Sequence, residues 1–251
     1  MFLDERHKQI IDLLERDGRV AVSELAPRFG VTEDCIRKDL KQLASQGKCR
    51  RVYGGATRVE VPVIREVRGR IGQLEPQKRA VAEKALALIE PGQTVFLDIS
   101  TTTLELARLL AARGTACTVI SPMVEILLVL GACPAITTIC PGGTMDTTLD
   151  GFVGSLALES LGRFRFDAAF LGAYGIDAES GEVSTYDIND GSLKRCAIEH
   201  AAHAYLVSEA RKVGTLGIYR FAHLGDFEAY ICDEPDGEEA AAVRAAGLDV
   251  R

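Results

Sequence analysis

The stretch that decides the fold of the N-terminal part is GVTEDCIRKDLKQL, residues 30–43. Thr32 is a favourable helix N-cap, and the two acids that follow it suit the positive end of a helix. The apolar side chains recur at i, i+4 and i+7 and therefore share one face: Ile36, Leu40 and Leu43. At about 100° per residue, Lys38 and Lys41 point roughly away from that face. The pattern predicts a helix with one apolar and one cationic face.

Two further helical patterns precede this one, and a short ribbon follows it. Residues 4–16 form the first pattern, which Asp17-Gly18 ends, and a second helix is expected from the N-cap Ser23 to Gly30. The run KCRRVYGGA, residues 48–56, alternates loosely and ends in a Gly pair, which is typical of a two-stranded ribbon. Three short helices and a basic ribbon describe a winged helix-turn-helix. A small helical interaction domain with a solvated basic face is the alternative.

Charge is distributed unevenly along the chain, which has a net charge of −7. Residues 1–58 hold 12 Lys/Arg and 9 Asp/Glu, a net charge of +3, whereas the remainder holds 17 against 27 and carries −10. A basic head on an acidic body keeps a protein soluble and offers one patch to a polyanion.

Composition excludes several other classes. The N-terminus, MFLDERHKQ, carries charges of both signs where a secretory signal would need an apolar stretch. The most apolar region, residues 126–140, is interrupted by Pro134 and too short to span a bilayer. The seven cysteines form no CxxC pair, so we expect neither disulfides nor a zinc site. The sequence predicts a soluble, cytoplasmic protein with no metal and no cofactor.

The rest of the chain alternates between strand and helix patterns. Residues 58–75 mix charges with Pro and Gly and are interpreted as a linker. From Pro76 onward, β-branched strands alternate with helices of 10 to 14 residues, which implies a largely parallel sheet covered on both faces. The expected organisation is a winged helix-turn-helix in 1–57, a linker in 58–75 and a larger α/β domain in 76–251.

Several motifs resemble those of a known family. RHKQIIDLLERDGRVAVSELAPRFGV (6–31), IRKDLKQL (36–43) and RRVYGGA (50–56) resemble the DNA-binding domain of the DeoR family of bacterial transcriptional regulators. LDISTTTLELARLL (97–110), PGGT (141–144) and DAAFLGAYGI (167–176) resemble its effector-sensing domain, which is related to sugar-phosphate isomerases and CoA transferases. The sequence departs from the family pattern at Cys35, where a Thr is usual, at Lys38, where an Arg is usual, at Tyr53, where a His is usual, and at Ser100, where a Gly is usual.

The resemblance implies that the helix in residues 30–43 is a recognition helix lying in the major groove of DNA. The residues then expected to contact DNA come from this helix and from the ribbon: Arg37, Lys38, Lys41, Thr32, Cys35, Lys48, Arg50 and Arg51. The ribbon cations would grip the phosphate backbone, which positions the protein without reading sequence; a solvated hairpin is the alternative. Asp39, an acid among these cations, is expected to pair with a nearby Arg.

A hydroxyl-rich turn follows the strand that ends at Asp98. Backbone N–H groups and hydroxyls at a helix N-terminus form an anion site, and ligands of open α/β sheets collect at the carboxyl ends of strands. The alternative is that Thr101 or Thr102 merely caps the helix. With the resemblance, the residues expected to bind a phosphorylated effector are Asp98, Ser100, Thr101, Thr102, Thr103, Gly142, Gly143, Gly172, Asp187, Lys194 and Lys212.

The sequence therefore predicts a transcriptional regulator, expected to be a repressor of carbohydrate catabolism genes. Its expected partners are double-stranded operator DNA, a phosphorylated sugar or related metabolite, and further copies of the same chain in a homodimer or homotetramer. The rival hypothesis is a sugar-phosphate isomerase-like enzyme that uses the C-terminal domain. The basic head has no role in such an enzyme, and no matched acid/base pair stands in a recognisable catalytic motif.

Overall fold

The computed structural model describes residues 3–45, 48–52, 54–57 and 66–251. Contacts divide the chain into two compact units, Met1–Val63 and Ile64–Arg251. Within the described residues, no helix combines the length and the apolar character needed to cross a membrane.

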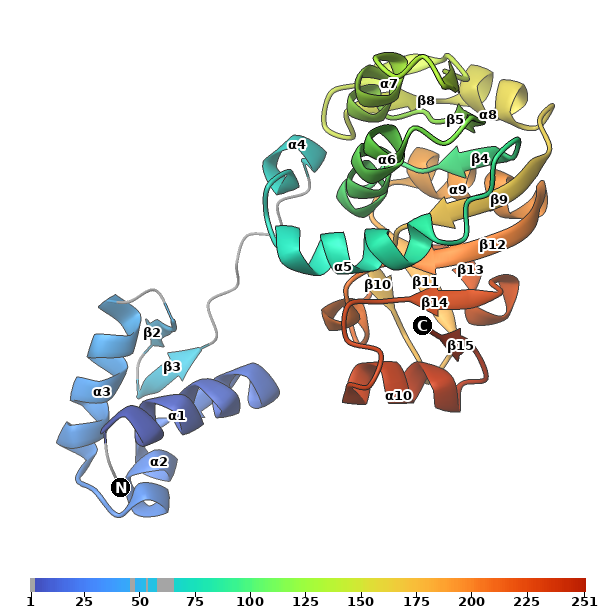
Figure 1. Cartoon of the computed structure of the whole chain (residues 1–251). Helices are drawn as coiled ribbons and strands as arrows, with labels where there is room; N and C mark the ends of the chain where they lie inside the picture. The colour runs from blue at the N-terminus through green and yellow to red at the C-terminus, as the bar shows by residue number, and fades with distance from the viewer. Residues whose placement is uncertain (1–2, 46–47, 53, 58–65) are drawn as a thin grey trace. The chain divides into compact units, whose positions relative to one another are not determined.

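Among its described residues, the first unit contains three helices and three short strands, drawn in blue in Figure 1. The helices are α1 (Leu3–Asp17), α2 (Val22–Phe29) and α3 (Glu33–Ser45), and the strands are β1 (Arg19–Ala21), β2 (Arg50–Val52) and β3 (Gly55–Thr57). The strands form an antiparallel sheet in the order β1-β3-β2. This unit is the winged helix-turn-helix that the sequence predicts, with a third strand added to the expected ribbon.

Strand β1 explains one wrong detail of the sequence prediction, the N-cap of the second helix. Ala21 pairs with Gly55 of β3, and Val22 N–H donates to Gly54 O at 2.8 Å. These bonds start α2 at Val22, with Ala21 in place of Ser23 as its N-cap residue. Gly55 itself is required, because a Cβ there would lie 2.0 Å from Val20 O.

The second unit is built on a seven-stranded sheet in the order β15-β14-β12-β9-β4-β5-β6. Every pairing in it is parallel. Its strands are β4 (Thr94–Leu97), β5 (Cys117–Ile120), β6 (Ile136–Ile139), β9 (Phe166–Leu171), β12 (Ala201–Val207), β14 (Ala229–Ile231) and β15 (Asp249–Val250). The central strands β4 and β9 are buried on both faces, as β-branched and apolar runs in a parallel sheet should be.

Helices cover both faces of this sheet (Figure 1). In the view shown, α5 (Glu75–Leu86), α6 (Thr101–Arg113) and α7 (Val124–Gly131) lie in front, and α8 (Ser155–Leu161) and α9 (Ile188–Glu199) lie behind. The remaining helical segments are α4 (Val67–Arg70), α10 (Glu238–Ala245), and the 3₁₀ turns η1 (Ala210–Lys212) and η2 (Leu224–Asp226). The two-layered covering of a parallel sheet agrees with the α/β class predicted from the sequence.

Two small antiparallel sheets complete the unit, and most of their strands are not predicted from the sequence. They are the hairpin β7 (Thr144–Asp146) and β8 (Gly151–Val153), and the sheet of β10 (Gly175–Ile176), β11 (Glu182–Thr185) and β13 (Tyr219–His223). Strands of two to five residues carry too few alternations for periodicity to reveal them.

The segment expected to be a linker, 58–75, differs from that expectation in its second half. Residues 58–65 lie outside the described residues, but Val67 is fully buried in the core of the larger unit. Its N–H donates to Thr148 O at 2.9 Å, and Arg68 forms an ion pair with buried Asp150 at 2.7 Å. Helix α4 is thus anchored on the second unit, so this unit begins about ten residues before the expected start at residue 76.

Candidate functional site

Helix α3 separates its side chains as the sequence predicts. Ile36, Leu40 and Leu43 are at most 1% exposed and belong to the core of the first unit. Lys38 and Lys41 are exposed and, within the described residues, form no ion pair. Packing α3 through its apolar face therefore leaves these two cations on the solvent side, where a polyanion can reach them.

Arg37 is also exposed, but it is held by acids of its own helix. Its guanidinium bonds Glu33 at 2.5 Å and Asp34 at 2.6 Å, and the hydrogen bond to Asp34 is the main reason that the pKa of Arg37 is raised. Ion pairs at such exposed positions are weak and exchange readily with other partners. A ligand must still displace these two acids before it can bind Arg37, so Arg37 is less available than Lys38. Helix periodicity alone does not reveal this difference.

Asp39 is withdrawn from the cationic face. It is 3% exposed and accepts two hydrogen bonds from Arg6 of α1, at 2.6 and 3.2 Å, with His7 Nε2 at 3.4 Å. The predicted pairing of Asp39 with a nearby Arg is thus confirmed. This bidentate bond ties α3 to α1 and removes a repulsive charge from the surface that would face phosphate.

The other residues predicted to contact DNA are placed as follows. Thr32 Oγ1 accepts from Cys35 N–H at 3.3 Å, as an N-cap does, and the Cys35 thiol lies 3.5 Å from Arg6 Nη2, on the side of α3 that faces α1. Lys48 and Arg51 are exposed, and Arg50 lies on β2, opposite Thr57 of β3. Cys35 is therefore engaged in helix packing.

In the second unit, polar residues gather where β4, β9 and β12 end. These strands are neighbours in the middle of the sheet, so their carboxyl ends lie side by side. Asp98 follows β4, Gly172 follows β9, and Glu209 comes two residues after β12. All three are buried, and Gly172 N–H donates to Asp98 Oδ2 at 2.7 Å. Gly172 has to be glycine, because a Cβ would lie 2.8 Å from Ser100 Cβ.

Asp98 and Lys194 form the centre of this cluster. Lys194 of α9 donates to Asp98 Oδ2 and pairs with Asp190 at 3.1 Å, and all three side chains are at most 6% exposed. Burial alone would lower the pKa of Lys194, but the two carboxylates outweigh it and raise that pKa. Burial raises the pKa of Asp190, and Lys194 offsets part of the rise.

The turn before α6 supplies hydroxyl groups to the cluster. Ser100 is the N-cap and accepts from Thr103 N–H at 3.1 Å, so neither Thr101 nor Thr102 is the cap. Thr103 Oγ1 donates to Asp98 Oδ1 at 2.9 Å, and Thr102 Oγ1 donates to Glu209 at 3.4 Å. The hydroxyls of this turn therefore brace the two acids that follow β4 and β12.

A second group of cations lies around Glu209. Lys212 of η1 lies 3.5 Å from Glu209 and donates to Ala173 O at 2.6 Å. Burial would raise the pKa of Glu209, but Lys212, a backbone hydrogen bond, Arg211 and Lys78 together lower it to about 2. Burial lowers the pKa of Lys212 itself.

Two cations of the cluster were not predicted from the sequence. Lys78 of α5 is 4% exposed, donates to Arg70 O at 2.9 Å, and has its pKa lowered to about 8 by burial, which outweighs the attraction of Glu209. Arg70 of α4 lies close enough to Asp190, Glu209 and Asp98 to be influenced by their charges, while burial lowers its pKa. Arg70 Nε is buried without a hydrogen-bond partner among the described residues. Arg70 lies in the segment that was interpreted as a linker, and Lys78 lies just after it. For this reason neither residue was predicted as part of a site.

The remaining predicted effector residues have structural roles. The Asp187 carboxylate caps α9 by accepting from Asn189 and Asp190 N–H at 2.8 and 3.0 Å. Gly142 and Gly143 have positive φ, and a Cβ on Gly143 would lie 2.6 Å from Val153 O. The close approach at Gly143 thus serves packing of the β7–β8 hairpin.

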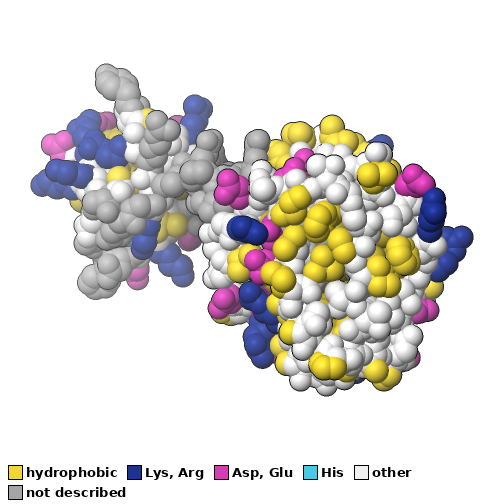
Figure 2. Space-filling view, turned by 90° about the horizontal axis from the view of Figure 1, so that it is seen from above, with side chains coloured by type: hydrophobic (Ala, Val, Ile, Leu, Met, Phe, Trp, Pro, Cys, Tyr) yellow, Lys and Arg dark blue, Asp and Glu magenta, His cyan; other side chains and the backbone are white. Residues whose placement is uncertain are grey.

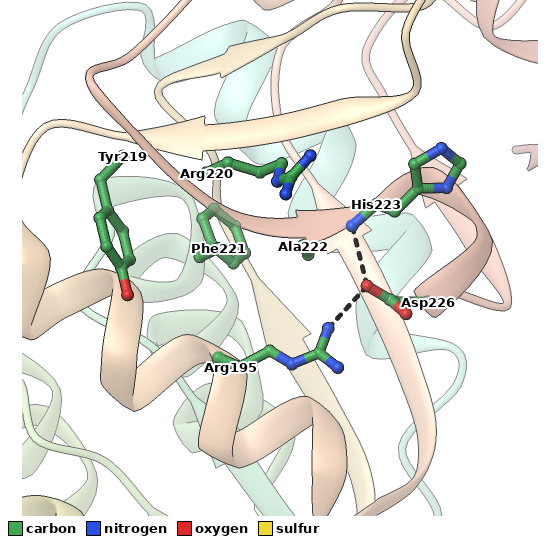
Figure 3. A pocket seen from close by; sticks show the side chains of 7 residues that line it. All are labelled: Arg195, Tyr219, Arg220, Phe221, Ala222, His223 and Asp226. Atoms are coloured by element: carbon green, nitrogen blue, oxygen red, sulfur yellow. Dashed lines mark hydrogen bonds and ion pairs between the residues drawn. The ribbon is translucent and has the colours of Figure 1, made fainter.

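A surface pocket of about 430 Å³ lies elsewhere on the second unit, and Figure 3 shows it. Arg195 of α9 and Asp226 of η2 point toward each other across it and bond at 2.8 Å. Arg195 also bonds Glu199, and Arg220 bonds Glu182 at 2.9 Å. Because both of its guanidinium groups are satisfied by acids of the protein, this pocket is a weaker candidate for an anion site than the strand-end cluster.

The two units together define the class of helix-turn-helix transcriptional regulators that carry a separate sensor domain. The model of the DeoR-like helix-turn-helix domain matches residues 6–61, and that of the DeoR C terminal sensor domain matches residues 74–234. The chain belongs to the DeoR family of transcriptional regulators.

Proteins similar in sequence cover more than nine tenths of the chain. The HTH-type transcriptional regulator GlpR of Haloferax volcanii is 34% identical over 98% of this chain and 96% of its own. The Glycerol-3-phosphate regulon repressor of Escherichia coli is 29% identical over 92% of this chain and 91% of its own. Among solved structures, eIF2B beta from Chaetomium thermophilum aligns with a TM-score of 0.50 and 15% identity, over 68% of this chain and 53% of that chain, which is a likeness of fold.

Proposed function

We propose that this regulator is a cytoplasmic repressor, which binds operator DNA through α3 and the β2–β3 ribbon and is released by a phosphorylated sugar or related metabolite. The proposed effector site is the strand-end cluster of the second unit. A homo-oligomer is part of the proposal, because a paired helix-turn-helix reads two half-sites whose spacing matches the protein's symmetry.

One observation carries the effector assignment, the surplus of cations that are buried or, in the case of Arg70 and Lys212, half-buried. Within the described cluster, Arg70, Lys78, Lys194 and Lys212 surround three acids, Asp98, Asp190 and Glu209. Buried charges need partners, and a buried donor without one is costly. The excess positive charge and the unpartnered Arg70 Nε favour a ligand with a compact negative group. The E. coli relative, a Glycerol-3-phosphate regulon repressor, supports a phosphorylated compound as the ligand.

The placement of Arg70 and Lys78 also suggests how the effector acts on DNA binding. Both belong to the first helices of the second unit, directly after the junction with the DNA-binding unit. A ligand that draws these cations inward favours one arrangement of α4 and α5. Coupling of this kind typically amounts to about 1–3 kcal/mol, roughly 5- to 150-fold in operator affinity, and it must be reciprocal.

The test of the effector site is calorimetry with matched ligands. Each member of a panel of sugar phosphates, with glycerol 3-phosphate included, is compared with its unphosphorylated counterpart. Two charge-assisted hydrogen bonds of about 1.5–3 kcal/mol each imply a preference for the phosphate of at least about a hundredfold. Arg70→Met should remove most of this preference, whereas Arg220→Met, which removes an exposed cation elsewhere, should keep it. Equal affinities for both members of every pair would refute the proposed site.

The test of the DNA-binding surface uses an operator selected from random duplexes with the full-length protein. Lys38→Ala and Lys41→Ala should each weaken binding, because these exposed cations have no competing partner within the described residues. Lys8→Ala, which removes an exposed cation of α1, is the matched control. Normal operator binding by both α3 variants would overturn the assignment of α3.

A further inference from the structure

Residues 114–162 of the second unit are unusually poor in charge. These 49 residues contain no Lys, Arg or His and only four acids, Glu125, Asp146, Asp150 and Glu159. A chain with 26% charged residues would place about 13 there. Asp150 is fully buried, so even fewer charges reach the surface.

This stretch builds one end of the sheet, which we call the β6 end: α7, β6, the β7–β8 hairpin and α8. Strand β6 is the last strand of the seven-stranded sheet, so one of its edges has no neighbour in that sheet. The hairpin is tied to the start of α7 by bonds from Val124 N–H to Asp150 O and from Phe152 N–H to Pro122 O, both 2.9 Å. The elements α7, β8 and α8 lie together at the top of the second unit in Figure 1, with α7 on one face of the sheet and α8 on the other.

Large apolar side chains are exposed at the β6 end. Leu128 of α7 is 65% exposed and Leu156 of α8 is 69% exposed, and Met145 of β7 and Leu158 of α8 are also accessible. Figure 2 looks onto this end and shows hydrophobic side chains spread over the larger unit, with Lys, Arg, Asp and Glu mainly toward its margins. Large exposed apolar side chains that gather at one charge-poor end of a domain are typical of a site of interaction.

The chemistry of the β6 end restricts what can cover it. Nucleic acid and anionic lipid need cations, and residues 114–162 contain none. In a two-fold contact the same patch of both copies meets, and the charges of residues 114–162 are all acidic, so a patch of this kind can meet itself only because these charges are few. The exposed edge of a parallel sheet is also normally protected by charge or by a partner, and β6 has no Lys, Glu or Pro.

We propose that the β6 end is the contact surface between two copies of this chain, with α7, α8 and the edge of β6 from each copy facing their symmetry mates. The proposal rests on the proposed function, because a repressor with one helix-turn-helix per chain reads a two-part operator only as a pair. The new element of the proposal is the surface through which the two copies bind each other.

The experiment is sedimentation equilibrium of the full-length protein and of charge variants. In a two-fold interface one substitution introduces a charge from each copy, so Leu128→Glu and Leu156→Glu should each raise the dimer dissociation constant at least about a hundredfold. Their high exposure makes both changes compatible with folding. Ile218→Glu is the matched control, because Ile218 is 75% exposed and lies outside the β6 end.

The outcomes separate this proposal from the function on which it rests. The expected result is that both leucine variants become monomers, still bind the phosphorylated ligand in calorimetry, and lose affinity for the two-part operator. A monomeric wild-type protein at micromolar concentration, dimers in both leucine variants, or monomers only for Ile218→Glu would overturn the proposed interface. Loss of ligand preference in Arg70→Met tests the effector site independently of any of these results.

Discussion

The cations of α3 and those of the strand-end cluster are held in opposite ways. Lys38 and Lys41 stand in solvent on a helix that is anchored by its other face. Lys194 and Lys78 are 3% and 4% exposed and are surrounded by acids and backbone oxygens. The exposed set suits a long polyanion whose binding releases counterions, whereas the buried set suits one small anion in a fixed geometry. Burial therefore distinguishes the two proposed sites, whereas residue type does not.

The largest expected difference between the regions is in their response to salt. If two heads each neutralise about three or four phosphates, log K for operator DNA should fall with log salt at a slope of roughly −5 to −7. Between 50 and 200 mM salt this is about 10³- to 10⁴-fold in affinity. Effector affinity should change by less than about threefold over the same range, because buried charges are screened far less. Anisotropy titrations measure the salt dependence of operator binding, and calorimetry measures that of effector binding. Similar slopes would show that the exposed and the buried cations do not differ in their response to salt.

The next largest effect is on stability. Lys194→Met leaves Asp98 and Asp190 buried without their cation, so the free energy of unfolding of the second unit should fall by about 3–5 kcal/mol. Lys38→Met removes an exposed cation and should change stability by less than about 0.5 kcal/mol. Urea denaturation, followed by circular dichroism, compares the two variants. Equal losses would mean that Lys194 is not integral to the core of its unit.

A smaller effect should appear in the pH dependence of effector binding. Lys78 has a pKa of about 8, so it is protonated below that pH and neutral above it. Its attraction for an anion is then present at pH 7 and lost as the pH rises, and affinity should weaken about tenfold by pH 9.5. Lys78→Arg keeps the charge throughout and should flatten the profile. Calorimetry from pH 7 to 9.5 decides this, and a profile unchanged in Lys78→Arg would assign the titration to another group.

The smallest expected effect concerns the partly engaged Arg37. Glu33→Gln removes one of its two acidic partners, so Arg37 becomes more available and operator affinity should rise about two- to fivefold. Asp12→Asn removes an exposed acid of α1 with the same change in net charge and is the control. An equal rise in both variants would show that only the overall charge matters.

The sequence predicted the helix-turn-helix unit and the parallel sheet correctly, because both depend on local periodicity. Apolar residues at helical spacing in α3 and β-branched runs in β4 and β9 report their environment within a few residues. The same logic located Asp98 and the hydroxyl turn, because a strand end followed by a helix start is a local feature. It also anticipated the pairing of Asp39, because an acid amid cations needs a partner.

The tertiary structure alone revealed what joins distant segments. Arg70 lies in a stretch whose mixed charges and glycines look like a linker, and only the order of β4, β9 and β12 makes a site that Arg70 can approach. The short strands β7, β8, β11 and β13 depend on pairing partners that the local sequence does not indicate. Composition and periodicity thus predicted the three helices of the first unit and the strands of the parallel sheet, whereas strand order decided which charged residues meet, because the local sequence does not show which distant segments come together.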